Sequence, residues 1–220
     1  MMNDIQGVSA KFNKETYMEA RKLAQKIVLL TASQFDVGMT SVDGERILSE
    51  LCDNFNVERL WHPHKFRVGT DTTKPFRKKS DPEIKLQKND IYFMDIGIVI
   101  NGHEADYGQT FTVGQNLEFA SAQKSVREIF NETKSCWEVE GLSGEALYIK
   151  ASAIAKEKGF ELNLDMDGHR LGDYPHGVFY KGSLSKFDKK PIENLWVLEI
   201  LIKHPEKEFG AFFEDILIKS

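Results

Sequence analysis

Cysteine is scarce in this sequence of 220 residues, which contains only Cys52 and Cys136. Neither has a second cysteine or a histidine at the spacing of a zinc finger, which argues against a thiolate zinc site. Long apolar runs are also missing, since the longest is residues 27–30, far short of a membrane span. The first residues, MMNDIQ, lack the basic start and apolar core of a signal peptide. These features predict a soluble, reduced, cytoplasmic protein that does not insert into a membrane.

The sequence has no strongly basic region. Its formal net charge is −5, its isoelectric point is near 5.7, and its densest basic run is residues 77–79. A short basic run is explained by a solvated loop, whereas nucleic-acid partners usually require a clear basic footprint. We therefore expect no nucleic-acid partner. No low-complexity stretch or Gly/Ser/Pro linker divides the chain, and 220 residues suffice for one sizeable core.

Apolar residues recur at helical spacing in several segments and follow strand-like patterns in others. The predicted helices are 13–35, 40–52, 117–137 and 144–158. Asn13 is the expected N-cap of the first helix, and Thr40 forms a capping box with Asp43 in the second. The predicted strands are 91–100, 105–113, 178–180, 196–202 and 212–218, with strand fragments and loops between 56 and 90. Helix pairs alternating with strand groups predict an α+β fold of two related halves.

Two predicted strands carry an acidic residue among apolar neighbours, where an unpaired buried charge would be costly. The dipeptide Asn101-Gly102 between them is a strong hairpin signal. A two-residue turn there pairs residue 95 with residue 108, so Asp106 lies one diagonal step from Asp95 on the same face. Two carboxylates at that separation share either a proton or a cation.

The last two predicted strands repeat this pattern with Glu199 and Glu214. A hairpin centred between Glu206 and Lys207 places these two acids directly opposite each other. A single acid on a strand is most often an edge or surface residue. Four acids in two facing pairs favour a functional site.

Residues 167–177 supply two histidines, His169 and His176, among three glycines. Glycine permits the tight turns and close backbone approach that metal and substrate pockets often require. A histidine taken alone is usually a hydrogen-bonded or surface residue, so the surrounding glycines carry this indication.

Several motifs together resemble the superfamily of methionine aminopeptidase, aminopeptidase P, prolidase and creatinase. Residues 89–97, NDIYFMDIG, and 105–114, ADYGQTFTVG, are similar to its two metal-binding strands. GHRLG at 168–172 is similar to its histidine motif, and LE at 198–199 and FED at 213–215 match its last ligand segments. The resemblance covers nearly the whole chain. It implies the pita-bread fold, with two pseudo-symmetric halves whose helices pack on a curved antiparallel sheet, as one catalytic domain of residues 1–220.

The resemblance also implies a centre of two divalent metal ions. Asp106 and Glu214 would bridge the two ions. Asp95 would complete the ligands of one ion, and His169 and Glu199 those of the other. A ligand set so rich in carboxylates suits manganese, cobalt, iron or zinc. In the family, two such ions hold a bridging hydroxide and stabilise the oxyanion that it generates.

The family's general base falls at Glu199, and His176 would hydrogen-bond the substrate or the tetrahedral intermediate. The family's upstream substrate histidine has no clear counterpart, because its position falls near Phe76. His62 and His64 lie earlier and serve as substrate-binding candidates only if their loop folds back. Two further differences are a glutamine at 109, where many relatives carry arginine, and the absence of the His-Glu of methionine aminopeptidases at 176–177. We see no counterpart of the extra amino-terminal domain of prolidase.

These features predict a dinuclear-metal hydrolase that releases the amino-terminal residue of a peptide, as an aminopeptidase or Xaa-Pro peptidase does. Two alternatives remain open. One is a creatinase-like hydrolase of a non-peptide C–N bond in a small amide, and the other is a catalytically silent binding module. A homodimer is also open. Trp61 and Phe187 would mark its interface if they are exposed, although either residue fits a core or pocket wall equally well.

Overall fold

The computed structural model describes residues 5–219, and it has the expected α+β composition. The helices are α1 (Lys14–Ala32), α2 (Ser41–Asn54), α3 (Leu117–Glu140) and α4 (Gly144–Glu157). The strands are β1 (Arg59–Leu60), β2 (Lys65–Val68), β3 (Asp90–Ile100), β4 (His103–Val113), β5 (Glu161–Leu162), β6 (His169–Arg170), β7 (Trp196–Lys203) and β8 (Gly210–Ile216). Asn13 caps α1, and Thr40 and Asp43 form the predicted capping box of α2.

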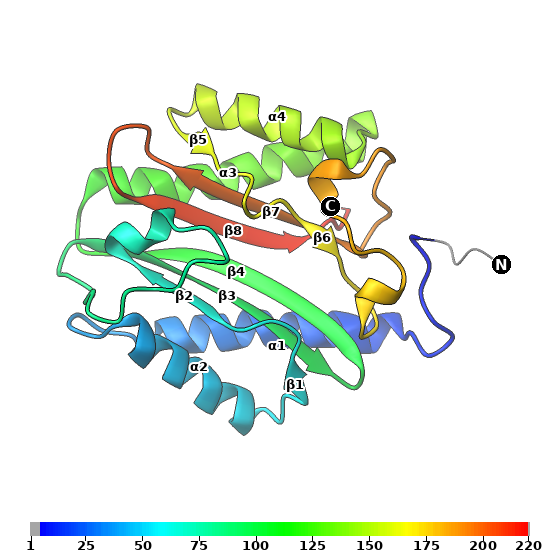
Figure 1. Ribbon diagram of the computed structural model, residues 1–220, viewed down its shortest axis with the longest axis horizontal. Helices are drawn as coiled ribbons and strands as arrows, with labels where there is room; N and C mark the ends of the chain where they lie inside the picture. The colour runs from blue at the N-terminus through cyan, green and yellow to red at the C-terminus, as the bar shows by residue number, and fades with distance from the viewer. Residues whose placement is uncertain (1–4, 220) are drawn as a thin grey trace.

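All strand pairs in the described residues are antiparallel and join into one eight-stranded sheet (Figure 1). Its order is β1-β3-β4-β8-β7-β5, with β2 also paired to β3 and β6 to β7. Each half of the chain places two helices beside one long hairpin, β3–β4 in the first half and β7–β8 in the second. The halves meet where β4 pairs with β8.

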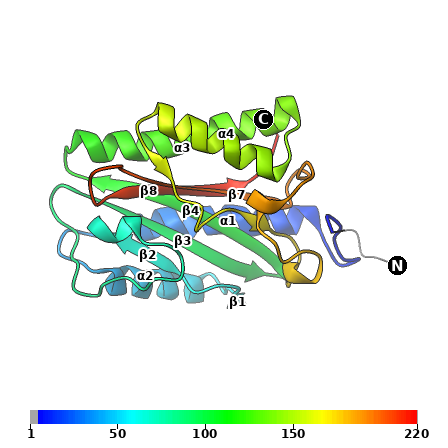
Figure 2. The same ribbon diagram turned by 45° about the horizontal axis from the view of Figure 1, so that its top comes forward.

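The helices cover one face of the sheet. In the first half α1 packs on β3 and β4, with α2 beside α1 and β2; in the second, α3 packs on β7 and β8, with α4 beside α3 and β5 (Figures 1 and 2). Alternate strand residues enter this apolar core, including Met94, Ile96, Ile98, Leu198, Ile200 and Phe213. Because side chains alternate between the two faces of a strand, residues 95, 199 and 214 project from the opposite face.

The β3–β4 turn has the predicted geometry. Asn101 and Gly102 have positive φ angles of 48° and 69°, which the twisted two-residue hairpin turn requires. The register runs from Ile100 opposite His103 to Asp90 opposite Val113, and it includes the predicted pairing of Asp95 with Gly108.

One sequence prediction was wrong in detail, and one open alternative is decided. Residues 176–178 form a short 3-10 helix, and residues 178–180 form no strand, because Pro175 and Gly177 interrupt a segment that has no partner strand. Phe187 is only 1% exposed and stacks on Trp196 at 4.2 Å between ring centroids, so it belongs to the core. Trp61 is half-buried and contacts the rings of His169 and His176 on the sheet face that the helices do not cover. An interface role therefore does not apply to Phe187, which is not exposed.

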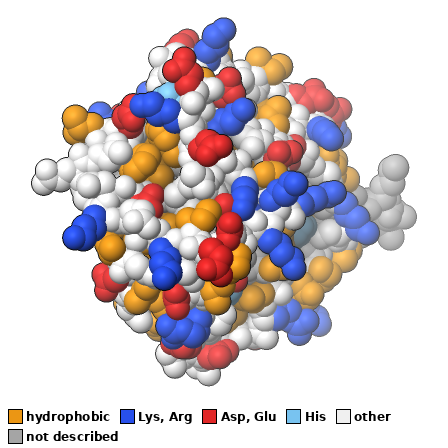
Figure 3. All heavy atoms as spheres, turned by 60° about the vertical axis from the view of Figure 1, so that its left-hand side comes forward, with side chains coloured by type: hydrophobic (Ala, Val, Ile, Leu, Met, Phe, Trp, Pro, Cys, Tyr) orange, Lys and Arg blue, Asp and Glu red, His pale blue; other side chains and the backbone are white. Residues whose placement is uncertain are grey.

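None of the helices within residues 5–219 has both the length and the apolar character needed to cross a membrane. On the face shown in Figure 3, lysine and arginine side chains are interspersed with aspartate and glutamate side chains.

The assignment of the core predicts different responses to the same substitution at a buried and at an exposed isoleucine. Ile200→Ala removes a fully buried side chain from the helix-covered core and should lower the free energy of unfolding by about 2–5 kcal/mol. Ile149→Ala, on the exposed side of α4, should change it by less than about 0.5 kcal/mol. Urea unfolding followed by circular dichroism measures both. Equal effects would contradict the assignment of the core.

Candidate metal centre

A row of carboxylates crosses the centre of the sheet on the face opposite the helices. Asp95 on β3 pairs with Gly108 on β4, Gly108 pairs with Glu214 on β8, and Glu214 pairs with Glu199 on β7. The predicted pairing of Glu199 with Glu214 is therefore confirmed. Four adjacent strands thus place Asp95, Glu214 and Glu199 in one row, although Asp95 is far from the other two in the sequence.

Gly108 is the member of this row without a side chain. A Cβ atom there would lie 2.8 Å from Oε1 of Glu214 and 2.4 Å from the ring of Phe212. Such contacts are too close to be tolerated without displacement of a neighbour. Glycine at position 108 therefore gives Glu214 the space to lie between Asp95 and Glu199.

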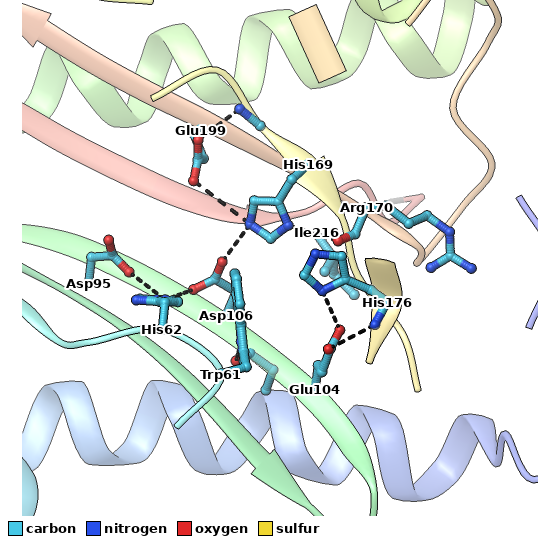
Figure 4. A network of polar contacts seen from close by, with 12 residues as sticks. Trp61, His62, Asp95, Glu104, Asp106, His169, Arg170, His176, Glu199 and Ile216 are labelled. Carbon is cyan, nitrogen blue, oxygen red and sulfur yellow. Dashed lines mark hydrogen bonds and ion pairs between the residues drawn. The ribbon is translucent and has the colours of Figure 1, made fainter. Parts of the chain in front are cut away.

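Asp106 and His169 join this row from either side. Asp106 lies two residues before Gly108 on the same face of β4, and its Oδ2 is 2.8 Å from Nε2 of His169. The same nitrogen is 3.8 Å from Oε1 of Glu199. Nδ1 of His169 donates to the carbonyl of Arg170 at 2.8 Å, which turns Nε2 towards the carboxylates (Figure 4).

The cluster holds more negative charge than its own imidazoles can balance. Asp95, Asp106 and Glu214 are at most 2% exposed, and both oxygens of Glu214 lack a hydrogen-bond partner among the described residues. Burial raises the pKa of Glu214 well above its usual range, and the adjacent Asp106 and Asp95 raise it further. Burial likewise raises the pKa of Glu199. Buried carboxylates without partners are costly unless a proton or a cation neutralises them.

The histidines respond to the same charges in the opposite direction. Burial lowers the pKa of His169, but the hydrogen bond and charge of Asp106 outweigh burial and raise that pKa to about 9. Burial also lowers the pKa of His62, and the charges of Asp95 and Asp106 raise it to about 9. Without a cation the imidazoles serve as the counter-charges of the cluster.

The donor atoms fall into two groups that fit divalent cations. Asp106, His169, Glu199 and Glu214 form one group, and His62, Asp95 and Asp106 form the other. Within each group the ligand atoms lie within 4.8 Å of one another. Carboxylate and imidazole donors suit the divalent transition metals, and Asp106 belongs to both groups. The residues therefore fit metal ions, as the sequence predicts.

Backbone contacts fix the orientation of Glu199. Its Oε2 accepts a hydrogen bond of 2.7 Å from the amide of Gly168, the residue before His169. Its backbone carbonyl accepts a 2.9 Å hydrogen bond from the hydroxyl of Tyr148 on α4. Oε1, the other carboxylate oxygen, is thereby left facing His169 and the cluster.

His176 lies at the edge of the cluster and is held by Glu104. Nδ1 of His176 is 2.9 Å from Oε2 of Glu104, and the backbone amide of His176 donates to Oε1 at 3.0 Å. The rings of His176 and His169 are stacked, with 5.5 Å between centroids (Figure 4). Sequence reasoning missed Glu104, although alternation places it on the same face of β4 as Asp106.

The three upstream substrate-binding candidates take different positions. Nε2 of His62 reaches Asp95 and Asp106, at 3.3 Å from each. Phe76 contacts the His62 ring edge-on, with 5.6 Å between centroids. His64 does not join them. It is buried with Nε2 4.0 Å from Sγ of Cys52 on α2, so it is not retained as a substrate-binding candidate.

A pocket of about 260 Å³ opens beside His169 and Glu199. Phe76 and Gly182 form part of its wall, and its lining carries charges of both signs, with Arg77 and Lys181 beside Asp165 and Asp167. The pocket therefore places apolar groups and charged groups of both signs next to the carboxylate cluster, within reach of a small ligand.

Solved structures of three proteins share this fold. An X-Pro aminopeptidase from Thermotoga maritima has 21% identity and a TM-score of 0.74, covering 98% of this chain and 63% of that chain. A prolidase from Pyrococcus furiosus has 22% identity and a TM-score of 0.72, covering 98% and 64%. A methionine aminopeptidase from Thermotoga maritima has 15% identity and a TM-score of 0.71, covering 97% and 100%. The chain thus spans less than two thirds of the first two proteins. These similarities confirm the predicted pita-bread fold.

Sequence comparison gives the family. No curated protein sequence matches the chain significantly. The model of metallopeptidase family M24 matches residues 15–219, which include all five predicted metal ligands and both histidines of the 167–177 segment. The chain therefore belongs to metallopeptidase family M24.

Proposed function

We propose that this chain is a dinuclear-metal peptidase that releases the amino-terminal residue of a short peptide, as an aminopeptidase or Xaa-Pro peptidase does. The observation that carries the proposal is the pair of donor groups that share Asp106 on one sheet face, beside a small pocket. One ion would be held by Asp106, His169, Glu199 and Glu214, and the other by Asp95 with the two shared carboxylates. Manganese, cobalt, iron and zinc all suit these donors.

The residues of the site divide the chemistry between them. Bound divalent ions would supply Lewis acidity and lower the pKa of water. Glu199, with Oε2 held by Gly168, accepts a proton from the attacking water and passes it to the leaving nitrogen.

His176 donates a hydrogen bond to the substrate carbonyl oxygen as negative charge develops there. Glu104 holds Nδ1 and the backbone amide of His176, so Nε2 is free to face the substrate. Glu104 acts on the reaction through His176 and is therefore a positioning residue.

An activity assay tests the proposal directly. Protein loaded with manganese or cobalt should cleave members of a panel of Met-Xaa and Xaa-Pro peptides. Glu199→Gln should lower kcat by about 10²- to 10⁴-fold, because the general base is lost. Glu206→Gln, an exposed residue in the β7–β8 turn, is the matched control and should retain full activity.

The other outcomes separate the alternatives. Two bound metals without peptide cleavage would favour a creatinase-like hydrolase of a small amide, with Phe76 in place of a substrate histidine. No bound metal under either loading condition would contradict the catalytic proposal and leave a binding module.

Metal removal tests the charge balance independently of activity. Saturation at 100 times Kd stabilises the protein by about 2.7 kcal/mol for each ion, which raises Tm by roughly 5–10 °C. Glu214→Gln should reduce this metal-induced gain, and it should leave the Tm of the metal-free protein nearly unchanged, because the raised pKa of Glu214 already keeps this carboxyl protonated and uncharged when no cation is bound. Glu206→Gln should change neither value. A markedly higher metal-free Tm for Glu214→Gln would show that Glu214 is ionised in the metal-free protein and would contradict this charge balance.

A double-mutant cycle tests the pairing of Glu104 with His176. Glu104→Gln and His176→Ala should each lower kcat/KM by about 10- to 100-fold, since groups that orient a functional histidine act on that scale. The double variant should be no slower than His176→Ala alone, because Glu104 acts through that ring. Additive losses would contradict the pairing. Unchanged Tm values would exclude a general folding defect.

A further inference from the structure

His62 points into the carboxylate cluster from the loop between β1 and β2 (Figure 4). Its side chain is 8% exposed, and its Nε2 is 3.3 Å from Oδ1 of Asp95 and 3.3 Å from Oδ1 of Asp106. An imidazole nitrogen therefore lies equally distant from two carboxylates that belong to the proposed centre.

These separations are long for hydrogen bonds, which between nitrogen and oxygen are usually about 2.7–3.2 Å. Oδ1 of Asp95 in fact lacks a hydrogen-bond partner among the described residues, although His62 lies beside it. Two donor atoms that bind one ion at about 2.0–2.2 Å lie roughly 3.0–3.5 Å apart, as the edge of a coordination polyhedron. Nε2 of His62 is thus spaced from each of the two carboxylate oxygens as two ligands of a common ion are.

The tautomer of His62 is set by a backbone contact. Its Nδ1 lies 2.8 Å from the carbonyl oxygen of Pro63, so Nδ1 carries a hydrogen and donates it. In the neutral ring the lone pair is then on Nε2, which faces the two carboxylates. A hydrogen bond of this kind is the usual way in which proteins orient a histidine that binds a metal.

Gly97 makes room for this arrangement. A Cβ atom at position 97 would lie 2.1 Å from Cδ2 of His62 and 2.6 Å from Cε2 of Trp61. The loop is also anchored to the sheet, because the amide of Trp61 donates to the carbonyl of Gly97 at 3.1 Å and its indole donates to the carbonyl of Ala105 at 3.3 Å. Contacts with β3 and β4 therefore fix the position of the imidazole.

We propose that His62 is itself a metal ligand, which completes the ion held by Asp95 and Asp106. This inference rests on the proposed dinuclear centre and adds a sixth protein ligand to it. Asp106 directs Oδ1 towards His62 and Oδ2 towards His169, so each ion receives one imidazole. A histidine at both positions shifts the preference of the centre towards cobalt, iron(II) and zinc, which accept imidazole more readily than magnesium does.

Metal binding to the full-length protein tests this inference without an activity assay. Metal-free wild type should bind two Co²⁺ ions in calorimetric titration, and His62→Ala should weaken one of them by at least tenfold. X-ray absorption at the cobalt edge should show one imidazole per ion in the wild type, and half that value in the variant. His204→Ala removes an imidazole in the β7–β8 turn and should leave both readouts unchanged.

Two results would overturn the inference without refuting metal binding by the carboxylate cluster. Two ions bound by His62→Ala with unchanged affinity and imidazole count would show that His62 is not a ligand. One ion in the wild type and two in the variant would show that the imidazole takes the place of a cation. A wild type that binds no ion would instead refute the dinuclear proposal and this inference together.

Discussion

The repulsion among four carboxylates on one sheet face is the constraint on which the rest of the structure depends. Asp95, Asp106, Glu199 and Glu214 approach one another where β3, β4, β8 and β7 lie side by side. If all four carboxylates are ionised, even two protonated imidazoles leave two negative charges unbalanced, and burial makes each of them costly. Without a cation this cost raises the pKa values of Glu214 and Glu199. Divalent cations would remove that cost. The same carboxylate cluster therefore explains both the charge imbalance and the proposed metal-dependent chemistry.

The scaffold offsets the cost of holding such a cluster. The helix-covered face of the same strands is mostly apolar, and α1 and α3 lie directly behind the acids. A partly buried ion pair between Arg21 of α1 and Asp215 of β8 joins the first half of the chain to the second, with 2.6 Å between Nε and Oδ1. The opposite face is thereby free to carry polar residues. The absence of side chains at Gly97 and Gly108 provides the space that these residues occupy.

Local signals predicted much of this arrangement. Asn101-Gly102 determined the register of β3 and β4, and the length of the last hairpin placed Glu199 opposite Glu214. The pairing of β4 with β8 has no local signal, because it joins residues more than 100 positions apart. The loops were the part of the structure that the sequence predicted least well. Nothing in the sequence favoured His62 over His64, although His62 reaches the cluster and His64 packs on α2. The contact of Glu104 with His176 depends on the path of a loop, which hydrophobic periodicity does not predict.

Anomalous diffraction from crystals of the manganese- or cobalt-loaded protein, recorded at the absorption edge of the metal, tests the central claim most directly. The account predicts two anomalous peaks that share Asp106 and Glu214, one beside His169 and Glu199 and the other beside Asp95. Diffraction without an anomalous peak among these carboxylates, from protein loaded at saturating metal, would contradict it.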